Sequence, residues 1–223
     1  MDLLTSGYEF LVKGGPVMWP LLLASVLAMG AAIERYLLLR GALDGAEDLI
    51  EDVSRAVVRG SVDEARGRAL RAGGPVGRVM AAGLDHWDAG SAACEKAMEE
   101  RGMIEREALS KRLVILDTVI TVAPLLGLLG TVTGMIKAFE VVGAENQIGS
   151  PTAITGGVAE ALIATATGLF IAIVTLVIYN YLNDRVRQVV GMMEIAGTRI
   201  VNLRTALDDA SGGTGNAHCA LPA

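Results

Sequence analysis

Residues 123–136 read APLLGLLGTVTGMI, and residues 157–180 read GVAEALIATATGLFIAIVTLVIYN. Both stretches are apolar, yet they hold glycines, threonines and, in the second stretch, one glutamate. In hydrocarbon there is little hydrophobic force between helices, so the close approach of small residues has to supply their association. An ionisable residue in such a stretch indicates a functional site. The two stretches therefore predict membrane helices that pack closely around something polar.

The composition agrees with this class. The chain has 223 residues, 52% of them hydrophobic, and 27 glycines, with a mean hydropathy of +0.47. It is too apolar for a soluble domain of this size. Three stretches have the length of roughly 17 to 25 residues that a hydrocarbon core of ~30 Å requires, namely 17–33, 113–136 and 158–182. We therefore expect an all-α integral membrane protein with three transmembrane helices.

The basic residues predict the orientation of the chain. Of 19 Lys and Arg, one precedes the first span, 13 lie between the first and second, one lies between the second and third, and four follow the third. Positive residues mark the cytoplasmic side, so the N-terminus is expected outside and the C-terminus in the cytoplasm. A cleaved signal peptide would carry its positive charge before the apolar core, whereas Arg35 and Arg40 follow it.

The remaining sequence is helical in pattern. Apolar residues at steps of three and four predict an amphipathic helix over 43–57, which Gly60 ends. Ser61 is expected to cap the next helix in a capping box with Glu64, and Gly73, Gly74 and Pro75 end it. After a third helix over 76–87, no stop signal interrupts the pattern between 91 and 136, so one continuous helix is expected there.

The predicted organisation has eight parts. They are an outer N-terminal segment (1–15), amphipathic over 3–12; transmembrane helix 1 (16–34); a cytoplasmic helical region (35–112); transmembrane helix 2 (113–137); an outer loop (138–156); transmembrane helix 3 (157–183); its cytoplasmic helical extension (184–210); and a disordered tail (211–223).

The cysteines and histidines predict neither a disulfide nor a metal site. Cys94 and Cys219 both fall on the predicted cytoplasmic side, which is reducing. Neither has the spacing partners of a zinc site, and His86 and His218 are isolated.

The second span has a face of small residues. Steps of three, four and three residues separate Pro124, Gly127, Thr131 and Gly134. These residues therefore lie on one side of a helix. Gly130 and Gly134 form a GxxxG pair, which favours close packing. On the third span, Gly168 is assigned the same packing role. The hydroxyl of Thr131 has two open roles, either lining a polar path or bonding its own backbone.

Glu160 is the one carboxylate in the third span and lies in its outer half. It is either near lipid headgroups or inside a polar cavity, because a charge at mid-membrane costs roughly 2.5 to 3.5 kcal/mol. Thr167 shares its helix face, whereas Thr165 is about 140° away. Asp117, near the inner end of the second span, is a secondary candidate that an interfacial position also explains.

At these residues the chain resembles a known family, the ExbB/TolQ/MotA proton-channel family, and is closest to its ExbB and TolQ branches. The MotA branch is disfavoured because its members look like proteins with four spans, whereas three spans are readable in this chain. The resemblance rests on GPVMWPLLLASVLAMGAAIER at 15–35, APLLGLLGTVTGMIKAF at 123–139, GVAEALIATATGL at 157–169 and IYN at 178–180.

The resemblance implies a stator subunit that converts proton motive force into mechanical work on the cell envelope. The subunit would form a homopentamer in the inner membrane, around the single transmembrane helices of a dimeric ExbD- or TolR-like partner, with a TonB-like or Tol-Pal protein as a further partner. Thr131, Thr165 and Glu160 would line the pore, and the proton-carrying aspartate would belong to the partner. Neither a cofactor nor nucleic acid is implied.

Two positions depart from the family pattern. Many members of the family that this chain resembles have a proline in the third span, where this chain has Val174. Thr167 stands at a position that is usually apolar in the family pattern. Thr167 would therefore either add a polar group to the pore or bond within its helix. Outer-membrane import, envelope constriction and surface motility all use similar stators, and these residues do not separate them.

Two other classes of membrane protein stay open at this point. A non-conducting scaffold would show the same glycines and amphipathic stripes. A small-solute transporter would show internal repeats or paired broken helices, which the three spans lack. We expect no enzyme, because no nucleophile, base and orienting group occur together.

Overall fold

The computed structural model describes residues 12–144 and 151–212, and within them it contains helices and no strand. Their bounds are α2 Met18–Arg40, α3 Ala46–Val58, α4 Val62–Ala72, α5 Gly74–Asp85, the 3₁₀ turn η1 Trp87–Ala89, α6 Ser91–Ser110, α7 Leu113–Ala144 and α8 Pro151–Gly212. Nearly all of the predicted amphipathic segment at 3–12 and of the predicted tail lies outside the described residues.

Three of the described helices are long and apolar enough to cross a membrane. They are α2, α7 over Leu113–Glu140, and α8 within Thr155–Asp209. These are the three spans that the sequence predicts, and the all-helical class with three candidate membrane helices is confirmed.

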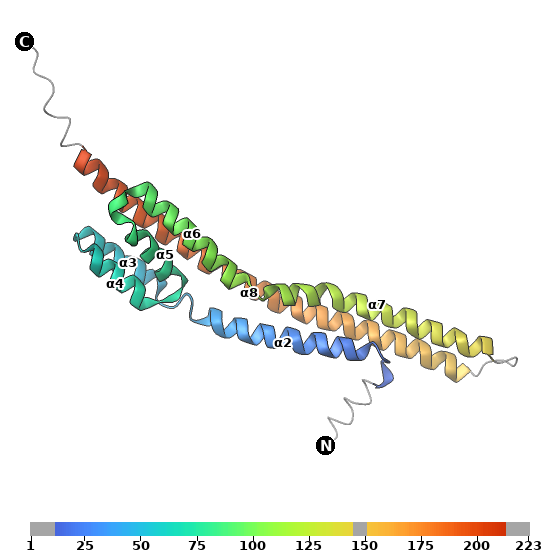
Figure 1. Ribbon diagram of the computed structural model, residues 1–223. Coiled ribbons are helices and arrows are strands. Elements are labelled where there is room, and N and C mark those ends of the chain that lie inside the picture. The colour runs from blue at the N-terminus through green and yellow to red at the C-terminus, as the bar shows by residue number, and fades with distance from the viewer. Residues whose placement is uncertain (1–11, 145–150, 213–223) are drawn as a thin grey trace, which may run out of the picture. The chain divides into compact units, whose positions relative to one another are not determined.

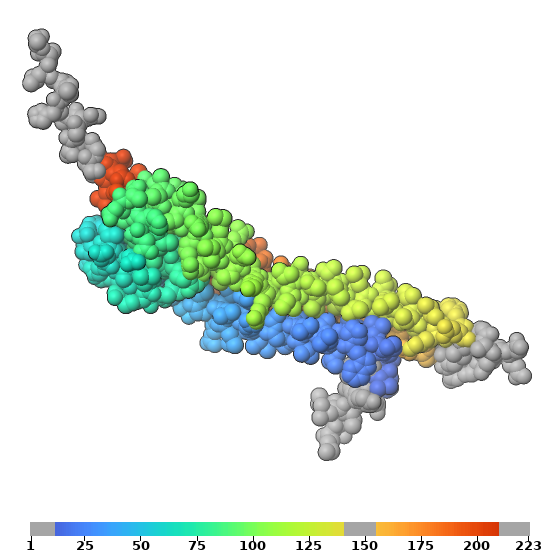
Figure 2. Space-filling model, viewed as in Figure 1, coloured from blue at the N-terminus to red at the C-terminus, as the bar shows by residue number. Residues whose placement is uncertain are grey.

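The chain divides into two compact units. The first comprises residues up to Tyr36 together with Arg112–Leu182. In it α2, α7 and the first part of α8 lie side by side (Figure 1), and α2 and α7 are in contact along the face that Figure 2 shows. Its core combines residues of all three helices with Val17, which directly precedes α2; the helical members are Met18, Leu21, Ala28, Val119, Ala123 and Ala172.

Outside that core, the helices of the first unit expose large apolar side chains. Leu23 on α2, Phe139 on α7 and Phe170 on α8 are 61%, 67% and 68% exposed. Monomeric soluble proteins rarely expose contiguous apolar patches of this kind, whereas lipid and neighbouring membrane helices cover them. The exposure agrees with the membrane class.

The second unit comprises Leu37–Lys111 and the chain from Asn183 onward. Its helices are short and amphipathic, and glycines with positive φ separate several of them, including Gly60 at 78° and Gly73 at 66°, a conformation that side chains with a Cβ rarely adopt. Apolar residues from α3, α4, α5, α6 and the later part of α8 form one core, with Ile50, Val53, Met80, Cys94 and Ile200 among its buried members.

The expectation of one continuous helix over 91–136 is wrong. α6 ends at Ser110 and α7 begins at Leu113. At the junction the N–H of Ile115 bonds the carbonyl of Arg112, three residues back instead of four, and the Arg112 guanidinium pairs with Glu34 on α2. The boundary between the two units falls at the same place, so the break coincides with a change of packing partners.

The expected capping box at Ser61 does not form. Ser61 is the N-cap of α4, but its side chain makes no capping hydrogen bond. The Glu64 carboxylate accepts a hydrogen bond of 2.6 Å from Arg68, one turn further on. An ion pair within the helix therefore replaces the reciprocal bond to the N-cap.

The membrane helices extend beyond the predicted bounds. α2 continues to Arg40 instead of ending at 34, α7 continues to Ala144, and α8 begins at Pro151 instead of 157. Pro151 suits the first position of a helix, since its missing N–H would have no partner there. Much of the predicted outer loop at 138–156 is thus helical, and α8 ends at Gly212, two residues past the predicted extension.

Candidate functional site

Three glycines of α7 lie directly against α8. A Cβ added to Gly127 would lie 3.1 Å from the carbonyl oxygen of Ala164, and one on Gly134 would lie 2.9 Å from the Cβ of Ala161. A Cβ on Gly130 would overlap the Cβ of Ala164. The two backbones therefore approach more closely than any larger residue would allow, which is how small residues hold membrane helices together.

α8 contributes glycines to the same contact. A Cβ on Gly168 would lie 2.5 Å from the carbonyl oxygen of Ala123, and one on Gly157 would lie 2.9 Å from the Cβ of Ala138. Because these neighbours are backbone atoms or the first carbon of a side chain, they cannot turn aside. The α7–α8 contact is thus closely packed from residue 123 to residue 138 of α7.

The N-terminal half of α7 carries Pro124 and Asp117. Pro124 is half-buried inside α7, which runs through it as one helix. Asp117 is exposed, and its backbone carbonyl accepts a hydrogen bond of 3.1 Å from the hydroxyl of Thr121. Asp117 therefore lies on the surface of the first unit, away from the glycine contact.

Thr165 joins the two helices through its side chain. Its hydroxyl donates a hydrogen bond of 2.8 Å to the carbonyl of Gly127 on α7. A hydroxyl has one proton to donate and two lone pairs that accept. With that proton engaged, the oxygen of Thr165 can still accept a hydrogen bond from water.

The other two threonines bond within their own helices. Thr131 donates to the carbonyl of Leu128 at 2.6 Å, and Thr167 donates to the carbonyl of Ile163 at 2.8 Å. The sequence left two roles open for each hydroxyl, and the structure shows the hydrogen bond to the helix's own backbone for both.

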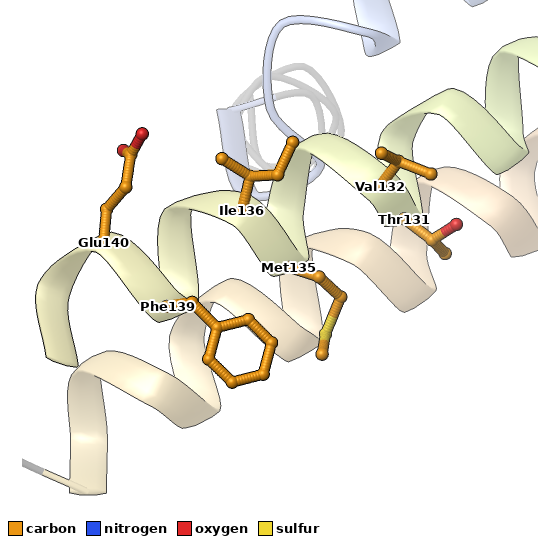
Figure 3. Close-up of a pocket in the computed structure, with 6 residues that line it drawn as sticks. All are labelled: Thr131, Val132, Met135, Ile136, Phe139 and Glu140. Atoms are coloured by element: carbon orange, nitrogen blue, oxygen red, sulfur yellow. The ribbon is translucent and has the colours of Figure 1, made fainter. Parts of the chain in front are cut away.

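Thr131 also lines a shallow, mostly apolar depression on the C-terminal half of α7 (Figure 3). All of its lining residues come from α7, and neither Glu160 nor Thr165 is among them: Thr131, Val132, Met135, Ile136, Phe139 and Glu140. In a single subunit, therefore, Thr131 does not share a cavity with the other two candidate pore residues.

Glu160 is enclosed from two sides. Its carboxylate oxygen lies 2.7 Å from the ammonium nitrogen of Lys137 on α7, and only 23% of its side chain is exposed. On the other side is Gly15, at φ 76°, where an added Cβ would overlap that carboxylate oxygen. Glu160 is therefore held in a specific place and does not extend freely from the helix.

Sequence reasoning did not identify Lys137 and Gly15. Lys137 is the one basic residue between the second and third spans, and that isolation was the available signal. No sequence signal pointed to Gly15, because only the fold brings the segment before α2 close to Glu160 on α8.

The second unit holds its own buried carboxylate. Glu105, on α6, accepts hydrogen bonds of 2.7 and 2.6 Å from Arg78 on α5 and pairs with Arg101 at 2.5 Å. Burial acts to raise the pKa of Glu105, but the hydrogen bonds and charges of the two arginines outweigh it, so the pKa is lowered. This cluster links α5 to α6.

Neither the acidic residues nor the cysteine of the described part form a metal centre. Within residues 12–144 and 151–212, no three His, Cys, Asp or Glu side chains come together in a way that could hold an ion. Cys94 is buried in the core of the second unit, and burial raises the pKa of its thiol.

The fold and these intramembrane groups together define an α-helical membrane protein with three candidate spans. Residues 71–195 match the model of the MotA/TolQ/ExbB proton channel family, and the chain belongs to that family. The matched region includes both the second and the third span.

Curated relatives support the ExbB/TolQ branch. The chain is 38% identical over 177 residues to the biopolymer transport protein ExbB-like 1 of Synechocystis, covering 78% of this chain and 69% of that one. It is 38% identical over 110 residues to ExbB of Aquifex aeolicus, covering 49% and 73%. With TolQ of the Tol-Pal system of Haemophilus influenzae it shares 44% over 85 residues, covering 38% and 37%.

Proposed function

We propose that this chain is the channel subunit of an inner-membrane motor of the ExbB–ExbD or TolQ–TolR type, and that it is not an enzyme. Such a motor converts proton motive force into mechanical work on the cell envelope. The observation that carries the proposal is the family match over residues 71–195. That region contains Thr131, Glu160 and Thr165, the candidate pore residues.

The chemistry of these side chains suits a proton path. A hydroxyl can accept from one water and donate to another, so threonines can support a chain of water without a fixed charge. Thr165 is already oriented by its bond to Gly127. The driving force of about 2.3 kcal/mol per charge per 100 mV is enough to shift a partner between packing states a few kcal/mol apart.

The proposed orientation puts the N-terminus in the periplasm and the C-terminus in the cytoplasm. Of the 19 basic residues, 17 lie between the first and second spans or after the third, which is 13 plus four. The positive-inside rule assigns those regions, and with them the second unit, to the cytoplasm.

The proposed assembly is a homopentamer around a dimer of single-span, ExbD- or TolR-like subunits, which in turn act on a TonB-like or Tol-Pal protein. The apolar side chains exposed on α2, α7 and α8 supply surface for neighbouring copies, for the partner's helices and for lipid. The relatives named as ExbB and TolQ support this kind of partner.

Complementation tests the proposal. In a host that lacks its own member of the family, co-expressed with the single-span protein that copurifies with this chain, the wild type should restore energy transduction. Thr131→Ala, Thr165→Ala and Glu160→Ala should assemble normally and restore little or none. Full activity of Thr165→Ala would remove the pore assignment. If no single-span protein with an intramembrane aspartate copurifies, a non-conducting scaffold becomes the better interpretation.

A further inference from the structure

We infer that Lys137 is a positioning residue for the proton path: its ammonium is the fixed counter-ion that holds the Glu160 carboxylate at the outer end of the α7–α8 contact. The inference rests on the proposed function and adds to it a residue of the second span. It starts from the distance of 2.7 Å between the Lys137 nitrogen and the Glu160 oxygen.

The backbones around the pair fix its geometry. Lys137 lies next to Ala138, and a Cβ on Gly157 would approach the Cβ of Ala138 to 2.9 Å. Glu160 lies next to Ala161, which approaches Gly134 equally closely, at 2.9 Å from an added Cβ. Two close contacts between the helices therefore flank the ion pair. They hold the backbones of Lys137 and Glu160 at a fixed separation.

The side of the carboxylate that Lys137 leaves open is closed by the backbone of Gly15. A Cβ on Gly15 would lie 2.7 Å from the carboxyl carbon of Glu160 and 3.0 Å from its Cγ. With Lys137 on one side and Gly15 on the other, Glu160 is only 23% exposed. An exposed ion pair contributes little, but a carboxylate enclosed in this way needs a partner, because burying an unpaired charge is costly.

A different arrangement is open to a lysine at this depth. Lysines near the end of a membrane helix can extend their charge toward the lipid headgroups, and Lys137 is itself 48% exposed. If Lys137 did so, Glu160 would lose its counter-ion and turn away from this place. The two arrangements predict different results for the same substitutions.

The test is a charge-swap cycle on the full chain, purified with its single-span partner and reconstituted in vesicles with a pH-sensitive dye inside. The single variants are Lys137→Met, Lys137→Arg, Lys137→Glu and Glu160→Lys, and the double variant carries Lys137→Glu with Glu160→Lys. Lys96→Met, which removes an exposed lysine of α6 in the other unit, is the matched control. Size-exclusion profiles check that each variant assembles.

We expect Lys137→Met to lower proton flux by about tenfold, within the range of coupling between charges in contact. Lys137→Arg and Lys96→Met should keep the flux near that of the wild type. Lys137→Glu and Glu160→Lys should each lose it, and the double variant should recover a measurable part, because the swap restores an opposite-charge pair.

Unchanged flux in Lys137→Met would overturn this inference but not the proposed function. It would indicate a lysine directed to the headgroups. A loss in Lys137→Met with no recovery in either Lys137→Arg or the double variant would also overturn it, since the lysine would then act through its shape. A wild-type complex without flux would instead remove the proposed function, and this inference with it.

Discussion

The hydroxyl of Thr165 shows how one residue serves both packing and the proposed function. It joins α7 to α8 through the carbonyl of Gly127, and its oxygen can still accept from water. The sequence predicted that this residue type matters, through the family resemblance, but not the bond, because spacing along one helix carries no information about the register between two helices. Lys137 and Glu160 escaped prediction as a pair for the same reason.

In the second unit, the ionised carboxylate of Glu105 is expected to contribute to the stability of the fold. Because its pKa is lowered in the folded chain, its ionised form stabilises the fold. That contribution is present above the ordinary carboxyl pKa of ~4.3 and is lost as the pH falls through the lowered value. Glu105→Gln should reduce the free energy of unfolding at neutral pH by about 1.5 to 3 kcal/mol, the contribution of hydrogen bonds to a charged group, and should flatten its acid dependence.

The fluorescence of Trp87 can follow this change. The chain has two tryptophans, and Trp87 lies in the core of the second unit, so a Trp19→Phe background isolates its signal. Glu99→Gln, at an exposed carboxylate of the same helix, is the control and should unfold like the background chain. Equal acid dependence with and without Glu105 would contradict the assigned role of the cluster.

At the scale of the helices, the glycine contact was predictable because it depends on one periodicity. Steps of three and four residues put Gly127 and Gly134 on a single face of α7 whatever the partner helix is. The break between α6 and α7 was not predictable in this way. Neither proline nor glycine marks it, and the interruption accompanies the ion pair of Arg112 with Glu34, a contact between residues far apart in sequence.

Gly168→Ala tests this contact, with Gly156→Ala as its control on the same helix. A Cβ at Gly168 would lie 2.5 Å from the Ala123 carbonyl oxygen, whereas a Cβ at Gly156 would meet no atom within 4 Å. Both substitutions gain helix propensity equally. Thermal unfolding in detergent should show Gly168→Ala destabilised by about 1 to 3 kcal/mol, as overpacking costs, and Gly156→Ala unchanged or more stable. The same result for both would contradict the packing role.

For the molecule as a whole, composition and hydropathy predicted the class well, since three apolar helices of spanning length are a property of the sequence itself. The candidate site was predicted less completely. In a single subunit, Thr131 lies in a depression of α7 that contains neither Thr165 nor Glu160. Under the proposed function, these residues meet only where copies of the chain and the partner's helices assemble, and one chain's sequence does not specify that geometry.

The central claim is that protons cross the membrane beside these helices, and the most direct test compares two substitutions of Thr165. Thr165→Ser keeps the hydroxyl, whereas Thr165→Val keeps the shape and removes it. In vesicles that contain the full chain and its single-span partner, an imposed proton gradient should collapse with the wild type and with Thr165→Ser at similar rates, and much more slowly with Thr165→Val. Equal rates for valine and serine would contradict the claim.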